Sequence, residues 1–385
     1  MGEWQQKTIG DLVMLQRGID LPSAERKSGS VPIMGSFGIT GRHSEAACKG
    51  PGVTVGRSGA SAGVVCYIDE DFWPLNTCLY VKDFKGNHPR FSYYLLKTFD
   101  LASLNSGSAQ PSLNRNFVHP VPASFPDPPE QEAIASVLGA LDDKIELNRR
   151  MNKTLEAMAR AIFKDWFVDF GPTRAKMEGR APYMAPDIWS LFPERLDDGK
   201  PEGWALRPVR DFAELRGGKQ LEKERIAAVG TIPVFGGAGV MGFTDEHNAD
   251  GFVISVGRVG AYCGQFFSHR GKAWINNNAS LIRQHEGISG EWLFQSLRHA
   301  DIEVIKKGAA QPFVSNTDVG NMPIIWPGEV VVGRFAEIVV PLMLRMEHND
   351  AEASTLAATR DILSPKLMSG EVRVKDAENL IGEAT

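Results

Sequence analysis

Residues 130–167 form the stretch EQEAIASVLGALDDKIELNRRMNKTLEAMARAIFKDWF, and it decides the fold. It contains no proline and a single glycine. Apolar side chains recur at steps of four and three residues from Ile134 to Trp166, and two asparagines, Asn148 and Asn152, interrupt the middle of this seam. Such spacing is typical of a long helix that packs against another helix. We therefore predict one long helix over residues 129–168.

A second stretch, residues 328–372, has a weaker seam of the same kind, from Phe335 to Leu363, and its middle is also polar. Two helices with apolar ends and polar centres favour an antiparallel, coiled-coil-like pair with a fixed register. We predict that Asn148 and Asn152 set this helix register at a cost in stability. The alternatives are that both asparagines face solvent or a partner, and that the helices are unrelated surface helices.

The chain is a tandem duplication, because similar motifs recur at an offset of 200 to 201 residues. Val55-Gly-Arg57 returns as Val256-Gly-Arg258, and Gly107-Ser-Ala-Gln-Pro111 returns as Gly308-Ala-Ala-Gln-Pro312. Each copy begins with a part that is rich in glycine and short β-type runs and contains one amphipathic helix, near Phe91 in the first copy. We predict an α+β fold with two similar globular heads, each followed by a long helix.

This organisation divides the chain into six segments. They are a first head at 1–128, a long helix at 129–168, a linker at 169–203, a second head at 204–327, a second long helix at 328–372 and a tail at 373–385.

The composition restricts the class of protein. The 385 residues include 42 Lys and Arg against 47 Asp and Glu, for a net charge of −5. Apolar residues make up 43% of the chain, which excludes a wholly disordered or collagenous protein. The four cysteines form no CxxC pair, so a zinc ribbon or disulfide scaffold is not expected and a reducing compartment is favoured. Because no signal peptide or membrane span is recognisable, we expect a cytoplasmic protein without membrane contact.

Three apparent catalytic motifs fail on inspection. Residues 52–58 have the wrong glycine spacing and lack the lysine of a phosphate-binding loop. The Asp-Pro-Pro turn at 127–129 is followed by Glu130, where an amino-methyltransferase needs an aromatic ring. Asp142, Asp143 and Lys144 have the outline of a nuclease triad but belong to the long helix, where we expect them on a solvated face. The histidines show no metal-ligand spacing, so we expect no active site and no metal site.

The central helix carries a specific resemblance to a known family. The run from Leu141 through Asn148 to Arg150, continued to Phe163-Lys-Asp-Trp-Phe-Val-Asp-Phe170, closely resembles the central helix of type I restriction–modification specificity subunits (HsdS). The pattern from Gly107 to Leu113, followed by Pro128-Pro-Glu-Gln131, is similar to the end of that family's target recognition domain. Residues 363–372 resemble the close of its C-terminal helix. The second copy departs from the pattern, because Trp326-Pro-Gly-Glu329 replaces Pro-Pro-Glu-Gln.

The resemblance implies a non-catalytic subunit of a restriction and adenine-methyltransferase complex. Each head would then be a target recognition domain that binds one half of a bipartite sequence in double-stranded DNA. The helices would set the gap between the halves and dock two methyltransferase subunits (HsdM). Motor–nuclease subunits (HsdR) would complete the complex, and S-adenosylmethionine would bind the methyltransferase rather than this chain.

Candidate DNA-binding residues are polar or cationic side chains of the heads, preferably on loops next to glycine. In the first head they are Arg42, Arg57, Ser58, Gln110, Asn114 and Arg115. In the second head they are Lys219, Arg258, Tyr262, Lys306, Lys307 and Gln311. Arginine could bind guanine, and glutamine or asparagine could bind adenine.

The repeated residues Arg57, Arg258, Gln110 and Gln311 have a second interpretation, because motifs shared by both copies can maintain the fold or bind phosphate. Lys and Arg slightly outnumber Asp and Glu in the heads, whereas acidic residues predominate in the helices and linker. This distribution permits DNA-binding heads without requiring them. The main alternative is a duplicated protein-interaction scaffold with no DNA role. Likewise Phe163, Trp166 and Phe167 could pack within the helix pair or contact the methyltransferase.

Overall fold

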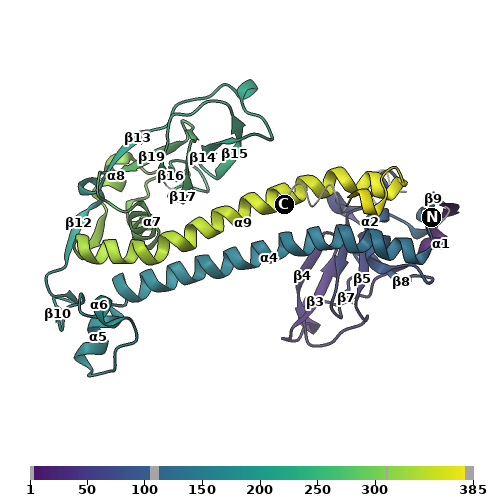
Figure 1. Ribbon diagram of the computed structural model, residues 1–385, viewed down its shortest axis with the longest axis horizontal. Coiled ribbons are helices and arrows are strands. Elements are labelled where there is room, and N and C mark those ends of the chain that lie inside the picture. The colour runs from purple at the N-terminus through teal and green to yellow at the C-terminus, as the bar shows by residue number, and fades with distance from the viewer. Residues whose placement is uncertain (1–3, 105–111, 309–310, 378–385) are drawn as a thin grey trace. The chain divides into compact units, whose positions relative to one another are not determined.

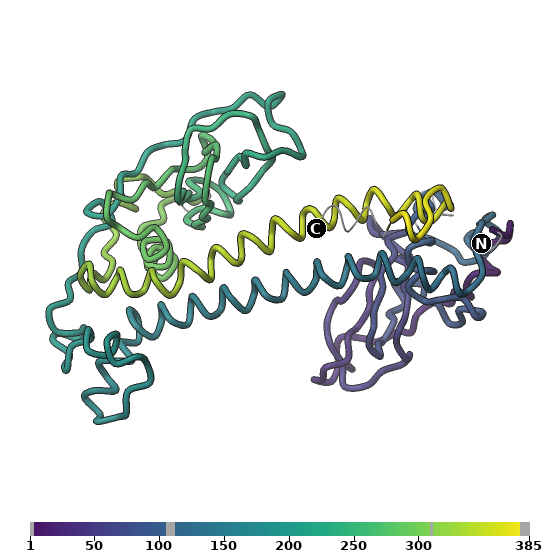
Figure 2. The backbone as a smooth tube through the Cα atoms, in the orientation of Figure 1, coloured from purple at the N-terminus to yellow at the C-terminus, as the bar shows by residue number. Residues whose placement is uncertain are grey.

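The computed structural model describes residues 4–104, 112–308 and 311–377, and its chain forms two compact units. The first unit comprises residues 1–150 and 349–385, and the second comprises residues 151–348. Each unit therefore contains one head together with part of each long helix. The long helices are α4 (Pro128–Phe167) and α9 (Glu329–Ser369), and both are continuous through the boundary between units (Figures 1 and 2).

The first head has a four-stranded sheet in the order β2-β8-β5-β6, a three-stranded sheet in the order β4-β3-β7, and the pair β1-β9. Its strands are β1 (Gln5–Thr8), β2 (Met14–Arg17), β3 (Val31–Gly35), β4 (Gly38–His43), β5 (Gly52–Gly56), β6 (Val65–Ile68), β7 (Trp73–Pro74), β8 (Cys78–Asp83) and β9 (Pro122–Phe125). Its helices are α1 (Ile9–Leu12), α2 (Pro89–Lys97) and α3 (Arg115–Val118), with short 3-10 turns η1 (Ser23–Glu25), η2 (Gly59–Ser61) and η3 (Leu101–Leu104).

The second head repeats this topology, with the sheets β13-β19-β16-β17 and β15-β14-β18 and the pair β12-β20. Its strands are β12 (Ala205–Pro208), β13 (Ala213–Gly217), β14 (Ile232–Gly236), β15 (Gly239–Thr244), β16 (Phe252–Gly257), β17 (Phe266–Arg270), β18 (Trp274–Ile275), β19 (Ala279–Gln284) and β20 (Pro323–Trp326). Its helices are α7 (Gly290–His299) and α8 (Asn316–Asn321), with η4 (Val209–Asp211), η5 (Lys223–Arg225) and η6 (Ile302–Ile305). The matching strand orders confirm the internal repeat and the α+β class.

Local chemistry explains where the head helices begin. Pro89 occupies the first turn of α2, where its missing N–H is not needed, and the His88 side chain accepts a hydrogen bond from the Phe91 N–H. In α7 the corresponding residue is Ser289, whose hydroxyl accepts from the Trp292 N–H at 3.2 Å. Both helices pack against an inner strand of the four-stranded sheet, β5 or β16, and its edge neighbour, β6 or β17, and all residues of β5 are buried.

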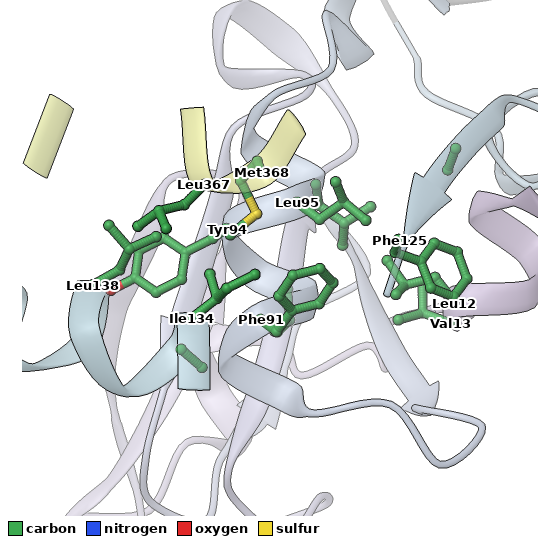
Figure 3. Close-up of a cluster of buried hydrophobic side chains, with 14 of the residues drawn as sticks. Leu12, Val13, Phe91, Tyr94, Leu95, Phe125, Ile134, Leu138, Leu367 and Met368 are labelled. Atoms are coloured by element: carbon green, nitrogen blue, oxygen red, sulfur yellow. The ribbon is translucent and has the colours of Figure 1, made fainter. Parts of the chain in front are cut away.

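The core of the first unit joins the head to both long helices. Phe91, Tyr94 and Leu95 of α2 pack with Ile134 and Leu138 of α4. Leu363, Leu367 and Met368 of α9 complete this core, and Figure 3 shows Leu367 and Met368 beside Tyr94. Residues from the end of the chain are therefore part of the hydrophobic core of the N-terminal head.

The core of the second unit is rich in aromatic rings. Phe163, Trp166 and Phe167 of α4 are only 2–4% exposed. They surround Phe335 of α9, with ring centroids 5.7, 6.1 and 5.2 Å away. Trp204, at the start of the head, lies 5.9 Å from Phe167. These three residues of α4 thus pack inside the unit.

The two long helices run antiparallel within each unit. In the first unit Arg360 Nη1 donates to Asp142 at 2.6 Å, and Asn148 donates to Glu352 at 2.8 Å. In the second unit Asn152 donates to the Met346 carbonyl at 3.1 Å. Residues further along α4 bond to residues nearer the start of α9, as the antiparallel prediction requires.

Residues 169–203 are folded. They form α5 (Gly171–Met177), α6 (Pro186–Trp189) and the short pair β10 (Leu196–Asp197) and β11 (Lys200–Pro201). Phe192 is 2% exposed and packs against Trp166. In the part of the chain that the structure describes, we find no helix with the length and apolar character needed to span a membrane.

Candidate nucleic-acid interface

The strongest candidate surface of the first head is built around the turn that follows β5, an inner strand of its four-stranded sheet. β5 ends at Gly56, and Arg57 leaves the sheet with its N–H bonded to the Thr77 carbonyl at 2.9 Å. The Arg57 carbonyl accepts from the Leu113 N–H at 2.7 Å, and Ser58 and Ser112 form an antiparallel bridge. The chain before α3 is thereby held against this turn, and Arg57, Ser58, Asn114 and Arg115 come together.

The second head repeats this geometry. Arg258 N–H donates to the Asn278 carbonyl at 3.0 Å, and the Arg258 carbonyl accepts from Val314 at 3.0 Å. Val259 and Phe313 form the bridge that corresponds to Ser58 and Ser112. The backbone of the turn is therefore part of the shared fold, whereas its side chains differ between the heads.

Neighbouring loops join the same surface. Ser36 Oγ donates to the Thr77 carbonyl at 2.7 Å, and the Asn76 amide donates to the Asp20 carboxylate. In the second head the corresponding hydrogen bond runs from the Asn277 amide to the Gln220 side-chain oxygen at 3.4 Å. We call these converging loops the turn cluster of each head. The turn cluster comprises residues 18–20, 36–38, 57–61, 76–77 and 112–115 in the first head and residues 218–220, 237–239, 258–262, 277–278 and 311–315 in the second.

Glycines permit the close approach of these loops. A Cβ added at Gly56 would lie 2.0 Å from the Ser61 carbonyl oxygen and 2.3 Å from that of Ser36. A Cβ at Gly257 would lie 2.3 Å from the Gly237 carbonyl oxygen. Because these distances are far shorter than van der Waals contact, the position directly before Arg57 and Arg258 requires glycine in both heads.

The predicted residues of the first head are only partly brought together. Arg57 is half-buried, and its Nη1 donates to the Asn76 carbonyl at 3.4 Å. Asn114 caps α3 by accepting from the Asn116 N–H at 3.0 Å, and Arg115 is exposed in the first turn of that helix. Arg42 lies outside the turn cluster, on β4 opposite Pro32, where it donates to the Ser30 carbonyl and pairs with Glu70 at 3.9 Å. Gln110 lies outside the described residues.

Most predicted residues of the second head lie in or beside its turn cluster. Tyr262 is 52% exposed, and Gln311 is exposed close to the Gly308 turn. Lys219 donates its backbone N–H to the Ile275 carbonyl at 2.9 Å. Arg258 is half-buried, and among the described residues its Nε has no hydrogen-bond partner.

Two lysines beside the turn cluster carry counter-charges. Lys306 pairs with Glu303, and Lys307 pairs with Asp318 at 2.8 Å. The bond from Lys307, together with the Ser315 hydroxyl, holds the pKa of the Asp318 carboxyl below its usual value. Lys307 would therefore have to leave Asp318, or share it, in order to bind a phosphate.

The two predicted register residues differ in environment. Asn148 is 1% exposed, its amide N–H₂ bonds to Glu352, and its Oδ1 has no partner within the described chain. Asn152 is half-buried and bonds to the Met346 carbonyl. Both side chains point into the helix pair and bond to α9, as a role in register requires.

The expectation of a solvated face for the acidic residues of α4 was wrong for Asp142. Its side chain is only 22% exposed, and it accepts from Tyr94 Oη at 2.5 Å and from Arg360 at 2.6 Å. Asp143, which is 63% exposed, accepts two bonds from Arg90. The sequence did not reveal these bonds, because the partners of Asp142 lie on α2 and α9, far away along the chain.

Sequence reasoning also missed Val259 and Phe313, because it searched for charged and amide side chains. They are 44% and 42% exposed on the turn cluster of the second head. The signal that could have found them is the comparison of the two copies, which places serine at both positions in the first head.

The cysteine thiols of the first head lie outside its turn cluster, and the pKa of each is raised. Burial raises the pKa of the Cys48 and Cys66 thiols and raises that of Cys78 to about 12, so these thiols stay protonated at neutral pH. Across residues 4–104, 112–308 and 311–377, no group of His, Cys, Asp or Glu side chains is arranged to hold a metal ion. What the turn clusters offer is hydrogen-bond donors, cations and apolar surface.

Comparison with known proteins gives a consistent result. Residues 1–157 and 201–329 match the family model described as the type I restriction modification DNA specificity domain. The specificity subunit of the type I restriction enzyme MjaIX from Methanocaldococcus jannaschii is 25% identical over 74% of this chain and 69% of the relative. That of HindI from Haemophilus influenzae is 22% identical over 74% of this chain and 77% of the relative.

A solved structure shares the fold. The S subunit of a type I restriction–modification system from M. genitalium aligns with a TM-score of 0.68 at 20% identity, over 95% of this chain and 96% of that chain. The family model matches two long segments, one in each copy of the repeat, and together they make up most of the chain. The chain therefore belongs to the family of type I restriction–modification specificity subunits.

Proposed function

We propose that this chain selects the DNA sequence for a type I restriction–modification complex, and that each head binds one half of a bipartite target. The observation that carries this proposal is the duplicated turn cluster. Its backbone hydrogen bonds recur in both heads: the bond to the arginine carbonyl measures 2.7 Å at Arg57 and 3.0 Å at Arg258. The side chains that the turn cluster presents differ between the heads. Two equivalent surfaces with different side chains suit two half-sites of different sequence.

Within each turn cluster we assign arginine to phosphate binding and the non-repeated residues to bases. Arg57 and Arg258 occupy equivalent positions, so they cannot by themselves distinguish two half-sites. Arg115 and Tyr262 are exposed and have no equivalent in the other head, where Asn316 and Ser61 stand in their places. They are therefore better candidates for base recognition.

The long helices set the gap between the half-sites in this proposal. α4 has 40 residues, which corresponds to about 60 Å at 1.5 Å per residue. Exposed apolar residues of the helices are candidates for docking two methyltransferase subunits, since Phe163, Trp166 and Phe167 are buried. They are Leu147, Met158, Val330, Leu344 and Ile362.

We assign the chemistry to partner subunits. Methyl transfer to an adenine in each half-site would use S-adenosylmethionine bound to the methyltransferase, and cleavage would need the motor–nuclease subunits. This chain would contribute sequence selection and assembly and would itself be non-catalytic.

A single-molecule methylome tests the proposal directly. The chain is expressed with its methyltransferase in a host that lacks other adenine methylation, and the methyltransferase alone is the control. The expected result is a bipartite motif with a fixed gap and one methylated adenine in each half, present only when this chain is present. The proposal fails if the complex assembles but methylates no such motif.

The salt dependence of DNA binding separates this function from a protein-interaction scaffold. Binding to phosphates releases counterions, so the logarithm of the binding constant should fall steeply with the logarithm of salt concentration. Replacing both Arg57 and Arg258 by alanine should reduce that slope by about 2, roughly 0.9 for each phosphate that is no longer neutralised. A scaffold without a DNA role predicts no specific binding and no change in slope.

A further inference from the structure

The turn cluster of the second head carries an exposed apolar patch at three positions where the first head has serine. We define this patch by Val259, Tyr262 and Phe313, which are 44%, 52% and 42% exposed. Val259 and Phe313 form an antiparallel bridge, so their side chains lie next to each other on one face. The Gly260 N–H also donates to the Pro312 carbonyl at 3.0 Å. The patch is thus held in place by the backbone on both sides.

The fold does not require these apolar side chains. In the first head the three positions are Ser58, Ser61 and Ser112, and Ser58 and Ser112 form the same bridge. The hydrogen bond from Val314 to the Arg258 carbonyl is also retained, as the bond from Leu113 to the Arg57 carbonyl at 2.7 Å. Because the backbone is maintained with serine, an interaction outside the head is the better explanation for valine, tyrosine and phenylalanine.

Cations border the patch. Arg258 directly precedes Val259, and its Nε lacks a hydrogen-bond partner among the described residues. Lys307 pairs through its backbone with Phe313, at 3.0 and 2.8 Å. A partner that fits such a surface carries negative charge beside small apolar groups. The DNA major groove has this chemistry, because the thymine C5-methyl group is the apolar group of its base edges and phosphates line the groove.

We propose that Val259 and Phe313 contact thymine methyl groups in the half-site bound by the second head, with Tyr262 at the edge of this contact. This inference rests on the proposed DNA-recognition function and specifies which chemical feature one head recognises. The first head, with serine hydroxyls at the same positions, makes no such methyl contact there. An exposed aromatic residue of its turn cluster is Phe37, at the β3–β4 turn, where the second head has Ala238.

Deoxyuridine tests this contact, because it differs from thymidine only in the missing methyl group. The complex of the full chain with its methyltransferase is bound to duplexes that carry the methylome-derived motif, with each thymine replaced in turn. We expect affinity to fall about fourfold for each buried methyl group that the replacement removes, the change that burial of one methyl group predicts. The V259S/F313S variant should bind the thymine and uracil duplexes equally at that position.

Two variants serve as matched controls. V229S removes an apolar residue of the second head that is 84% exposed and lies outside the turn cluster, and it should retain the uracil effect. S58V/S112F places the same side chains on the equivalent bridge of the first head and should leave the uracil effect of the second half-site unchanged. Assembly with the methyltransferase and far-ultraviolet circular dichroism show that each variant is folded.

The outcomes are distinguishable. Sequence-specific binding that is insensitive to uracil at every thymine overturns the methyl contact and leaves the proposed function intact. The same holds if V259S/F313S still discriminates thymine from uracil. If the unaltered complex binds no bipartite motif, the proposed function itself fails, and the methyl contact fails with it.

Discussion

Asp142 is the residue at which three elements of the first unit meet. Its carboxylate accepts from Tyr94 of α2 at 2.5 Å and from Arg360 of α9 at 2.6 Å, and the acid and Arg360 are only 22% and 23% exposed. A poorly solvated charge that loses its counter-ion is costly, whereas a solvated ion pair contributes little. Asp142 therefore has a larger effect on stability than its place on a helix surface suggests.

Asp142→Asn should destabilise the first unit by about 1–3 kcal/mol, because it leaves Arg360 without its less exposed partner. Asp361→Asn is the matched control, since Asp361 bonds to the same guanidinium but is 68% exposed. The control should change stability by less than about 0.5 kcal/mol. Urea unfolding, monitored by hydrogen exchange in α2, measures the stability of the first unit in both variants. Equal effects of the two variants would refute this role.

His119 gives the first unit a dependence on pH. Its Nε2 accepts a hydrogen bond from the Leu15 N–H at 3.0 Å, and burial lowers its pKa below 6.5. As the pH falls, His119 therefore takes up a proton more readily in the unfolded chain than in the folded one. The contribution of His119 to the stability of the first unit is thus complete above pH 6.5 and is lost as the pH falls below it.

His119→Gln should flatten the fall in stability of the first unit as the pH drops below 6.5, because glutamine can accept the same bond without titrating. Some slope should remain, since burial also lowers the pKa of His88. Replacing His247, an exposed histidine of the second head, is the control. The measurement is the urea midpoint as a function of pH, and an unchanged profile would contradict the role of His119.

At the scale of elements, the polar centre of the α4–α9 pair is where we predict that the helix register is set, at a cost in stability. The buried Asn148 bonds to Glu352 through its N–H₂ group, yet its Oδ1 is left without a partner in the described chain. A buried acceptor without a hydrogen bond is unfavourable, whereas leucine at the same seam position would pack without that penalty.

Replacing Asn148 and Asn152 with leucine should preserve folding and loosen the register of the helices. In the assembled complex, the methylome should then show a second gap length beside the original one. Arg149→Leu is the control, because it introduces the same side chain at an adjacent exposed position. A single unchanged gap in the double variant would count against the register role.

The sequence predicted the two long helices and the duplicated α+β heads, because these depend on the spacing of apolar residues and on a repeat of similar motifs. The positions of Ile134, Leu138 and Leu141 in the seam are enough to predict their burial. The ion pairs were not predictable. Lys306 and Lys307 look alike in the sequence, and only the fold shows that Glu303 and Asp318 neutralise them. Asp142 likewise finds Arg360 only after two distant helices pack.

At the scale of the whole molecule, the described part of the chain has two large hydrophobic cores, and residues of α9 and the segment after it complete the core of the first head. Leu356, Leu363, Leu367, Met368 and Ala377 are all at most 5% exposed in that core. The core of the second head contains buried residues from Ala159 to Val339. The first unit therefore depends on both ends of the chain, whereas the second is made from its middle.

Deleting residues 349–385 should expose the apolar face of α4 in the first unit and abolish the slow hydrogen exchange of β5 and α2. The second unit should keep its protection, since its core loses no residue. Adding residues 349–377 as a separate peptide should restore protection in the first unit. Hydrogen exchange with mass spectrometry reports on each unit separately, and a first unit that stays protected after the deletion would refute this dependence.

The shared core also determines the order in which the protein matures during synthesis. The ribosome delivers Ile145 of the first core long before Leu356, and roughly 200 residues of translation separate them, which takes roughly 10–40 s. During this interval the first head lacks the residues of α9, so the apolar side chains that α9 covers in the folded protein are exposed to solvent. The second head has all its buried core residues once Val339 has emerged. The head that is encoded last is thus the first to be complete.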